Sequence, residues 1–115
     1  FGLKVALHSC GSIHRVIPDL IDAGVEALHP IQAKATDMEA ERLKREFGED
    51  LCFIGGVDTQ DLLSNGTADE VRAEVRRLVD IFGDGIVISP SHEAILPDVP
   101  PANVEAMFDE AVNLG

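Results

Sequence analysis

Apolar residues along this chain follow two alternating patterns. Short runs in which nearly every residue is apolar predict buried strands, and apolar residues that recur every three or four positions predict amphipathic helices. The strand-like runs are residues 3–7, 25–28, 51–54 and 85–88. A helical pattern follows each run, with the predicted inward positions Ile13, Val16, Ile17, Leu20 and Ile21, then Ala40, Leu43 and Phe47, then Val71, Val75, Leu78, Val79 and Phe82, and last Val104, Met107, Phe108, Ala111 and Val112.

Residues that start and stop helices stand at the ends of these patterns. Thr36-x-x-Glu39 and Thr67-x-x-Glu70 read as capping boxes, which predict a helix start at each. A glycine follows each of the first three helical patterns, and Pro100-Pro101 opens the last.

The order of these elements indicates the fold class. Parallel strands need crossover helices and are buried on both faces, so apolar strands alternating with amphipathic helices predict an α/β fold with a parallel sheet. An open doubly wound sheet and a (β/α)8 TIM-type barrel both fit this spacing. Four strand–helix units are half of such a barrel, and the chain opens directly on a strand. We therefore expect residues 1–115 to be a single-domain fragment, the C-terminal half of a longer protein.

Composition and charge limit the classes of partner that this chain can be expected to bind. Of the 115 residues 45% are hydrophobic, enough for one core, and 21 acidic against 9 basic residues give a net charge of -12, which opposes binding to nucleic acid. No run approaches the length of about 18 apolar residues that a membrane span needs, and the first residues lack the pattern of a signal peptide. We expect a cytoplasmic protein with no membrane partner. The two cysteines, Cys10 and Cys52, do not suggest a disulfide scaffold.

Polar residues gather just after the predicted strands. In both architectures the chemistry lies at the carboxyl ends of the strands. Those ends read 8–11 (His-Ser-Cys-Gly), 29–32 (His-Pro-Ile-Gln), 55–60 (Gly-Gly-Val-Asp-Thr-Gln) and 89–93 (Ser-Pro-Ser-His-Glu). Three of the four histidines are there, and His14, within the first helical pattern, is expected on the solvated surface.

His8 and Cys10 form a candidate metal pair. Side chains two positions apart leave the same face of a strand, so an imidazole and a thiolate would reach one spot, as a zinc ion requires. The alternative is a histidine beside a buried, inert cysteine. His92 is the candidate third ligand, which would leave zinc one open position; its alternative is a hydrogen bond to a backbone carbonyl or to Glu93.

Further candidates concern substrate binding. Asp58 could bind polar groups of a substrate, with Gln60 beside it, or could cap the turn of residues 58–61. Gly56, in a Gly-Gly pair, would let the backbone approach a ligand closely, although the full pattern of a phosphate-binding loop is missing. His29 is held extended by the following proline and would shape the rim of the site. Cys52 opens its strand at the opposite end and is expected in the core.

Several of these segments resemble one known family. Residues 8–11, 55–59 and 89–92, followed by the more specific 96–104, are similar to the uroporphyrinogen decarboxylase superfamily, which also contains cobalamin-dependent methyltransferases acting on coenzyme M. The resemblance covers essentially the whole chain. It implies an eight-stranded barrel, in agreement with the four units counted above.

The two branches of that family imply different chemistry. In the methyltransferases an H-x-C motif, matching His8 and Cys10, supplies two zinc ligands, and a cysteine near the place of His92 supplies a third. The decarboxylases lack the H-x-C pair, use a histidine of that loop at the substrate, and carry their key aspartate and arginines in the N-terminal half.

We expect, first, zinc-dependent methyl transfer from a corrinoid, free or protein-bound, to a small-molecule thiol. His92 and Asp58 are the candidate catalytic residues. The alternatives are cofactor-free uroporphyrinogen decarboxylation, as in porphyrin and haem biosynthesis, and a non-catalytic assembly module. The isolated fragment is expected to be inactive and to associate with itself, because a half-barrel exposes the apolar edges of its outer strands.

Overall fold

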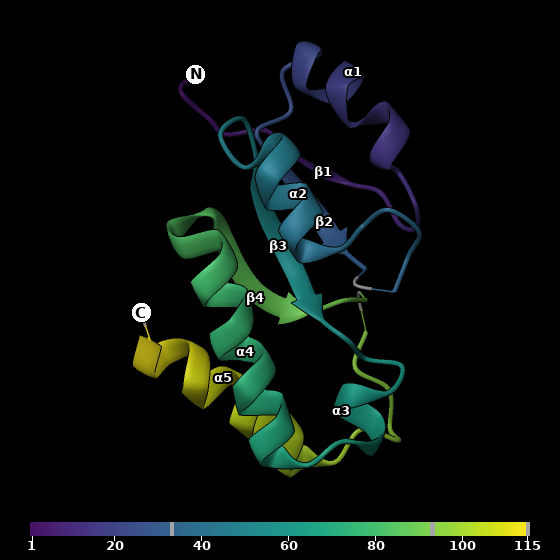
Figure 1. The fold of residues 1–115 in the computed structure, drawn as a ribbon, viewed down its shortest axis with the longest axis vertical. Helices are drawn as coiled ribbons and strands as arrows, with labels where there is room; N and C mark the ends of the chain where they lie inside the picture. Colours follow the sequence, from purple (N-terminus) through teal and green to yellow (C-terminus); the bar gives the residue numbers. More distant parts are fainter. Residues whose placement is uncertain (33, 93, 115) are drawn as a thin grey trace.

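Four parallel strands form one sheet in the computed structural model, which describes residues 1–32, 34–92 and 94–114. The strands are β1 (Ala6–His8), β2 (Ala27–Ile31), β3 (Cys52–Val57) and β4 (Ile86–Pro90). Helical segments lie between successive strands and after the last one (Figure 1). The predicted α/β fold of four consecutive strand–helix units is confirmed.

The order of the strands separates the two candidate architectures. The order is β1-β2-β3-β4, so each strand pairs with the one that precedes it in the chain. A doubly wound sheet reverses direction at a switch point, whereas consecutive strands of a (β/α)8 barrel follow one another around the barrel. The arrangement is therefore that of neighbouring strands in a barrel.

The helical segments are as follows. They comprise η1 (His14–Val16), α1 (Ile17–Asp22), α2 (Ala40–Phe47), α3 (Leu62–Asn65), α4 (Ala68–Phe82), η2 (Gly83–Gly85) and α5 (Pro101–Leu114). The short helix α3 was not predicted from the sequence. Within the described ranges, no helix combines the length and the apolar character that crossing a membrane requires.

The first two strands lie further along the chain than the apolar runs suggested. The register pairs Ala6 with Ala27, Leu7 with Leu28 and His8 with His29. Residues before Ala6 lie outside the paired strand, although the Val5 carbonyl still accepts the Ala27 N–H at 3.1 Å, and the side chains of Leu3 and Val5 are exposed. The shift matters for function, because it places His8 and His29 on the strands themselves rather than in the loops.

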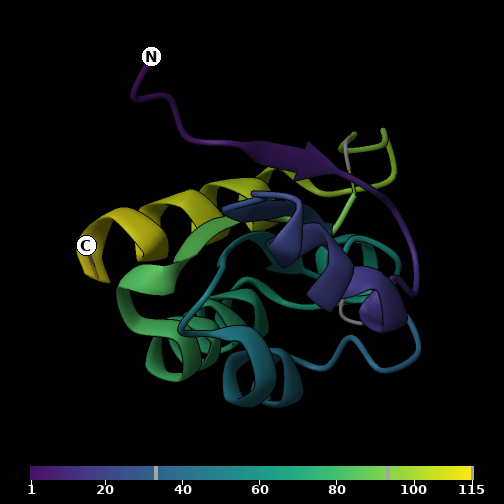
Figure 2. The ribbon, with the colours of Figure 1, turned by 90° about the horizontal axis from the view of Figure 1, so that it is seen from above.

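One face of the sheet is covered by helices and the other is open. Phe53 is fully buried and packs against Phe82 of α4, with ring centroids 5.0 Å apart. Helices α2 and α4 lie on this side of the sheet (Figures 1 and 2). On the strands' other face Val87 is 57% exposed, and Cys52 is exposed as well. The prediction that Cys52 lies in the core is wrong, because side chains alternate along a strand and Cys52 points away from the side that buries Phe53.

Three residues predicted to face inward are exposed. Val16 lies in the 3-10 turn before α1, where three residues per turn replace the helical period on which the prediction rested. On α5 the buried side chains are Asn103, Ala106 and Met107. Phe108 and Val112 lie on the side of α5 that faces solvent, and the Val112 side chain is 77% exposed.

Only one of the two predicted capping boxes forms. Thr67 accepts a hydrogen bond from the Glu70 N–H at 3.2 Å, and the Glu70 carboxylate accepts one from the Thr67 N–H at 3.2 Å. The box at Thr36 is wrong: α2 begins at Ala40, and its N-cap, Glu39, makes no side-chain capping bond. The chain turns at residues 34–37 and buries Met38 before the helix starts, which moves the helix past the threonine.

His14 connects two helical segments instead of facing solvent. Its side chain is 17% exposed, hydrogen-bonds the Glu46 carboxylate and lies 5.5 Å from the Phe47 ring, measured between centroids. The hydrogen bond from His14, assisted by the charge of Arg42, lowers the pKa of Glu46 below its usual value of 4.5. The surface prediction for His14 is therefore wrong, because the residue packs against α2.

Candidate functional site

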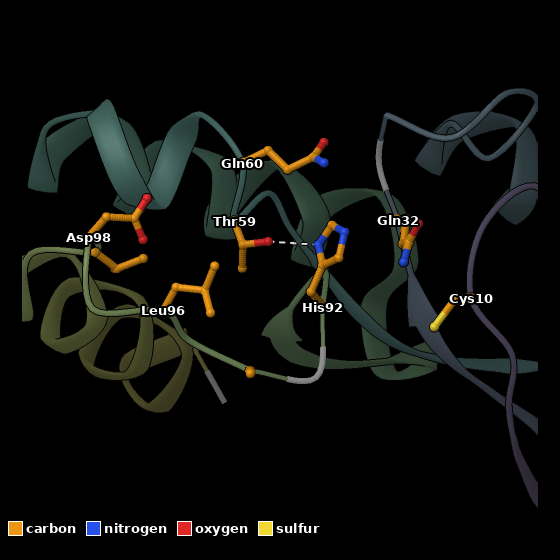
Figure 3. A pocket seen from close by; sticks show the side chains of 9 residues that line it. Cys10, Gln32, Thr59, Gln60, His92, Leu96 and Asp98 are labelled. Carbon is orange, nitrogen blue, oxygen red and sulfur yellow. Dashed lines mark hydrogen bonds between the residues drawn. The ribbon is translucent and has the colours of Figure 1, made fainter.

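The carboxyl ends of the strands border a cavity of about 380 Å³. Side chains from all four strand-end segments contribute to its lining (Figure 3). The lining residues are Cys10, Gln32, Thr59, Gln60, His92, Ala94, Leu96, Asp98 and Val99. The cavity therefore lies at the sheet edge where the sequence predicts the site.

His8 and Cys10 contact each other at the end of β1. The distance from His8 Nε2 to Cys10 Sγ is 3.4 Å, and both residues are exposed. A nitrogen and a sulfur bound to one tetrahedral zinc ion lie about 3.5 Å apart, given Zn–N and Zn–S bonds of about 2.0 and 2.3 Å. The donor types and their separation fit a shared zinc ion.

The other nitrogen of His8 contacts His29. The two Nδ1 atoms are 3.0 Å apart, and the rings meet edge to face with centroids 5.0 Å apart. His8 and His29 are partners in the register of β1 and β2. His29 thus lies behind His8 at the strand end, a contact that the sequence did not predict.

His92 lies in a separate hydrogen-bond group. Its Nδ1 is 2.7 Å from Thr59 Oγ1 and 3.0 Å from Ser91 Oγ, and Ser91 Oγ also accepts the Thr59 N–H at 3.2 Å. Ser91 is only 1% exposed. Thr59 and Ser91 were not selected as site residues from the sequence; their positions next to Asp58 and His92 were the available signal.

The three predicted zinc ligands do not form a single cluster in this structure. Among residues 1–32, 34–92 and 94–114, no group of three or more His, Cys, Asp or Glu side chains is placed to hold a metal ion. His8 and Cys10 are paired, while the Nδ1 of His92 is bonded to hydroxyl groups. Glu93, the alternative partner of His92, lies outside the described residues. His92 as a third ligand stays a prediction.

Asp58 caps the turn that follows β3. Its carboxylate accepts hydrogen bonds from the backbone N–H groups of Gln60, Asp61 and Leu62 at 3.0 to 3.2 Å. The Lys34 ammonium lies 3.4 Å from the same carboxylate. The capping alternative is thereby confirmed, and a catalytic or substrate-binding role of Asp58 stays a prediction.

The two glycines of β3 allow close packing. Gly55 has φ +124°, and a Cβ there would lie 2.9 Å from the Ile31 backbone nitrogen. At Gly56, with φ +96°, a Cβ would lie 3.1 Å from a methyl group of Leu78. Contacts with β2 and α4 account for both glycines, and a substrate-binding role of Gly56 stays a prediction.

Charge near the cavity is mostly acidic. Asp98 is the charged residue among the described side chains that line it, and Gln32, Gln60 and Thr59 supply neutral polar groups. Lys34, near the rim, is paired with Asp58 and Asp61. Because Leu96 and Val99 also line the cavity, the wall away from Asp98 suits a ligand part that is apolar or neutral.

Comparison with known proteins places the chain among related enzymes. A sequence model of the family "Uroporphyrinogen decarboxylase (URO-D)" matches residues 2–114. The chain is 28% identical over 101 residues to the methylcobamide:CoM methyltransferase MtaA of Methanosarcina barkeri (strain Fusaro / DSM 804). It is 24% identical over 102 residues to a uroporphyrinogen decarboxylase of Chlorobaculum parvum. Among solved structures, a methyltransferase from Methanosarcina mazei superposes with a TM-score of 0.76 at 24% identity, which shows a shared fold.

The chain corresponds to a part of each relative. The matches cover 88% and 84% of this chain but 28% and 27% of the two relatives. The structural match covers 98% of this chain and 32% of the other.

Proposed function

The chain belongs to the uroporphyrinogen decarboxylase (URO-D) family, and from that premise we propose that it supplies His8 and Cys10 as zinc ligands to an enzyme that transfers a methyl group from a corrinoid to a thiol. The observation that carries the proposal is the distance of 3.4 Å between His8 Nε2 and Cys10 Sγ. Similarity to a methylcobamide:CoM methyltransferase supports the same reaction class.

Each residue has a defined part in this proposal. His8 binds through the Nε2 lone pair and Cys10 through its thiolate. Zinc held there would lower the pKa of a substrate thiol, so that the thiol reacts as a thiolate at neutral pH. Cys10 and His92 line the same cavity, so a thiol that reaches Cys10 lies along the wall that carries His92 (Figure 3). Gln32 and Gln60 offer amide groups that orient the polar end of the substrate.

Zinc content tests the proposal. We expect about one zinc ion per chain after loading and dialysis, measured by elemental analysis, and near-complete loss in His8→Ala and Cys10→Ser, because each removes a ligand from an open site. Cys52→Ser is the matched control, because it removes an exposed thiol at the opposite end of the sheet and should keep the zinc. A wild-type chain that binds no zinc, or Cys10→Ser with unchanged zinc, would contradict the proposal.

Uroporphyrinogen decarboxylation is the second candidate. It is favoured by the similarity to decarboxylases and by His92, which is held by Thr59 and Ser91 and not by the His8–Cys10 pair. In that reading His92 contacts the substrate and no metal is required. A zinc-free wild-type chain would favour this candidate.

A further inference from the structure

We propose that His29 is a positioning residue for His8: it fixes the tautomer and ring orientation that aim the His8 Nε2 lone pair at Cys10. The inference rests on the proposed zinc site. It is carried by two contacts of one ring, His8 Nδ1 to His29 Nδ1 at 3.0 Å and His8 Nε2 to Cys10 Sγ at 3.4 Å.

The strand register brings the two imidazoles together. His8 and His29 are directly paired between β1 and β2, and the Ser9 N–H donates to the His29 carbonyl at 2.9 Å just beyond that pair. The backbone of both residues is thus held at the point where β1 ends. His29 is half-buried, which restricts the positions its ring can take, whereas His8 is exposed and depends on its contacts for orientation.

The proton between the two rings determines what His8 can bind. Two imidazole nitrogens at 3.0 Å form a hydrogen bond only when one of them carries a proton. If His8 Nδ1 carries it, Nε2 is a lone pair that can accept the Cys10 thiol proton or bind a metal ion. If His29 carries it, a neutral His8 has its proton on Nε2 and cannot be a ligand. His29 therefore serves the site as the acceptor.

A neutral acceptor has a consequence for charge. Metal-bound histidines commonly donate their second N–H to a carboxylate, a carbonyl or a water molecule, and that partner fixes the tautomer. Here the partner of His8 is a neutral imidazole. The pair of ligands His8 and Cys10 therefore carries a single negative charge, that of the Cys10 thiolate, and His29 adds none.

Zinc affinity and the tautomer of His8 together test the role of His29. We expect His29→Leu to weaken zinc binding about 10- to 100-fold in competition with a chelator, as is typical when the partner of a metal-bound histidine is lost. His29→Gln, whose side-chain oxygen can accept the same proton, should recover most of the affinity. In the metal-free chain, ¹⁵N NMR should show the proton of His8 on Nδ1 in the wild type and a shift of the tautomer toward Nε2–H in His29→Leu.

His14→Leu is the matched control, because it makes the same substitution at a histidine that contacts Glu46 and Phe47. It should leave zinc affinity and the His8 tautomer unchanged. If the wild type shows the expected tautomer, and His29→Leu alters it, but no zinc binds, the zinc proposal fails while the positioning role stands. An unaltered His8 tautomer in His29→Leu overturns the inference, as does a wild type that binds zinc no more than twofold better than His29→Leu.

Discussion

Asn103 is a buried polar residue that ties two distant segments together. It is 3% exposed, and its Nδ2 donates to the carbonyl oxygens of Leu63 at 3.0 Å and Gly66 at 2.8 Å. These bonds attach the first turn of α5 to the end of α3, the helix that starts at the turn capped by Asp58. Asn103 belongs to residues 96–104, the stretch most similar to the family, and the structure gives it a structural role.

Replacing Asn103 with leucine should destabilise the fold. The variant removes one donor group and leaves two carbonyl oxygens without their partner, so we expect the free energy of unfolding to fall by about 1–3 kcal/mol. Denaturant-induced unfolding followed by circular dichroism measures the change. Asn113→Leu, at an exposed position of the same helix, should change it by less than about 0.5 kcal/mol. Equal effects of the two substitutions would show that the buried hydrogen bonds add nothing.

The residue at which a helix begins depends on tertiary contacts of the chain as well as on the local sequence. The four-residue pattern of a capping box occurs twice, yet Thr67 caps α4 and Thr36 does not cap α2. Around Thr36 the chain is held by a different contact, since Ser12 Oγ donates to the Thr36 carbonyl at 2.6 Å. The same local pattern therefore has a different outcome where tertiary contacts compete with it.

The two threonines should differ in their contribution to stability. We expect Thr67→Ala to lower the free energy of unfolding by about 1 kcal/mol, because the Glu70 N–H loses its acceptor at the start of α4. Thr36→Ala should cost less than half of that. Thermal or denaturant unfolding of both variants provides the comparison, and a loss at Thr36 as large as that at Thr67 would count against this assignment of the caps.

The helices of the molecule cover one face of its sheet and leave the opposite face open. Val87 is exposed on the open face, and Leu3 and Val5 of the N-terminal segment are exposed as well. The chain spans about 28% of the length of the methyltransferase MtaA that it resembles. An apolar sheet face with open edge strands tends to associate with another surface of the same kind.

We propose that this chain associates with itself through that face and its edge strands. Sedimentation velocity over a range of concentrations should show dimers or larger species. Val87→Lys, which puts a charge on edge strand β4, should shift the distribution toward monomer. Ala73→Lys, at an exposed position of α4 on the covered side of the sheet, is the control and should leave the distribution unchanged. A clean wild-type monomer would exclude this assembly.

Local patterns were sufficient for the class of fold and for the edge of the sheet where the site lies. A strand or an amphipathic helix follows from residues close in the chain, and the carboxyl ends of parallel strands must meet at one edge. The contact between His8 and Cys10 could also be predicted from local sequence, because side chains two positions apart on a strand point to the same face.

Contacts between strands could not be predicted in this way. The bond between His8 and His29 depends on the register of β1 and β2, and the bonds of His92 to Thr59 and Ser91 depend on how the loops after β3 and β4 meet. Register and loop conformation are set by packing of residues that are far apart in the chain, among them Gly55 against Ile31. The sequence alone therefore determined which chemical groups gather at this sheet edge, and the tertiary structure decided which of them are bonded to one another.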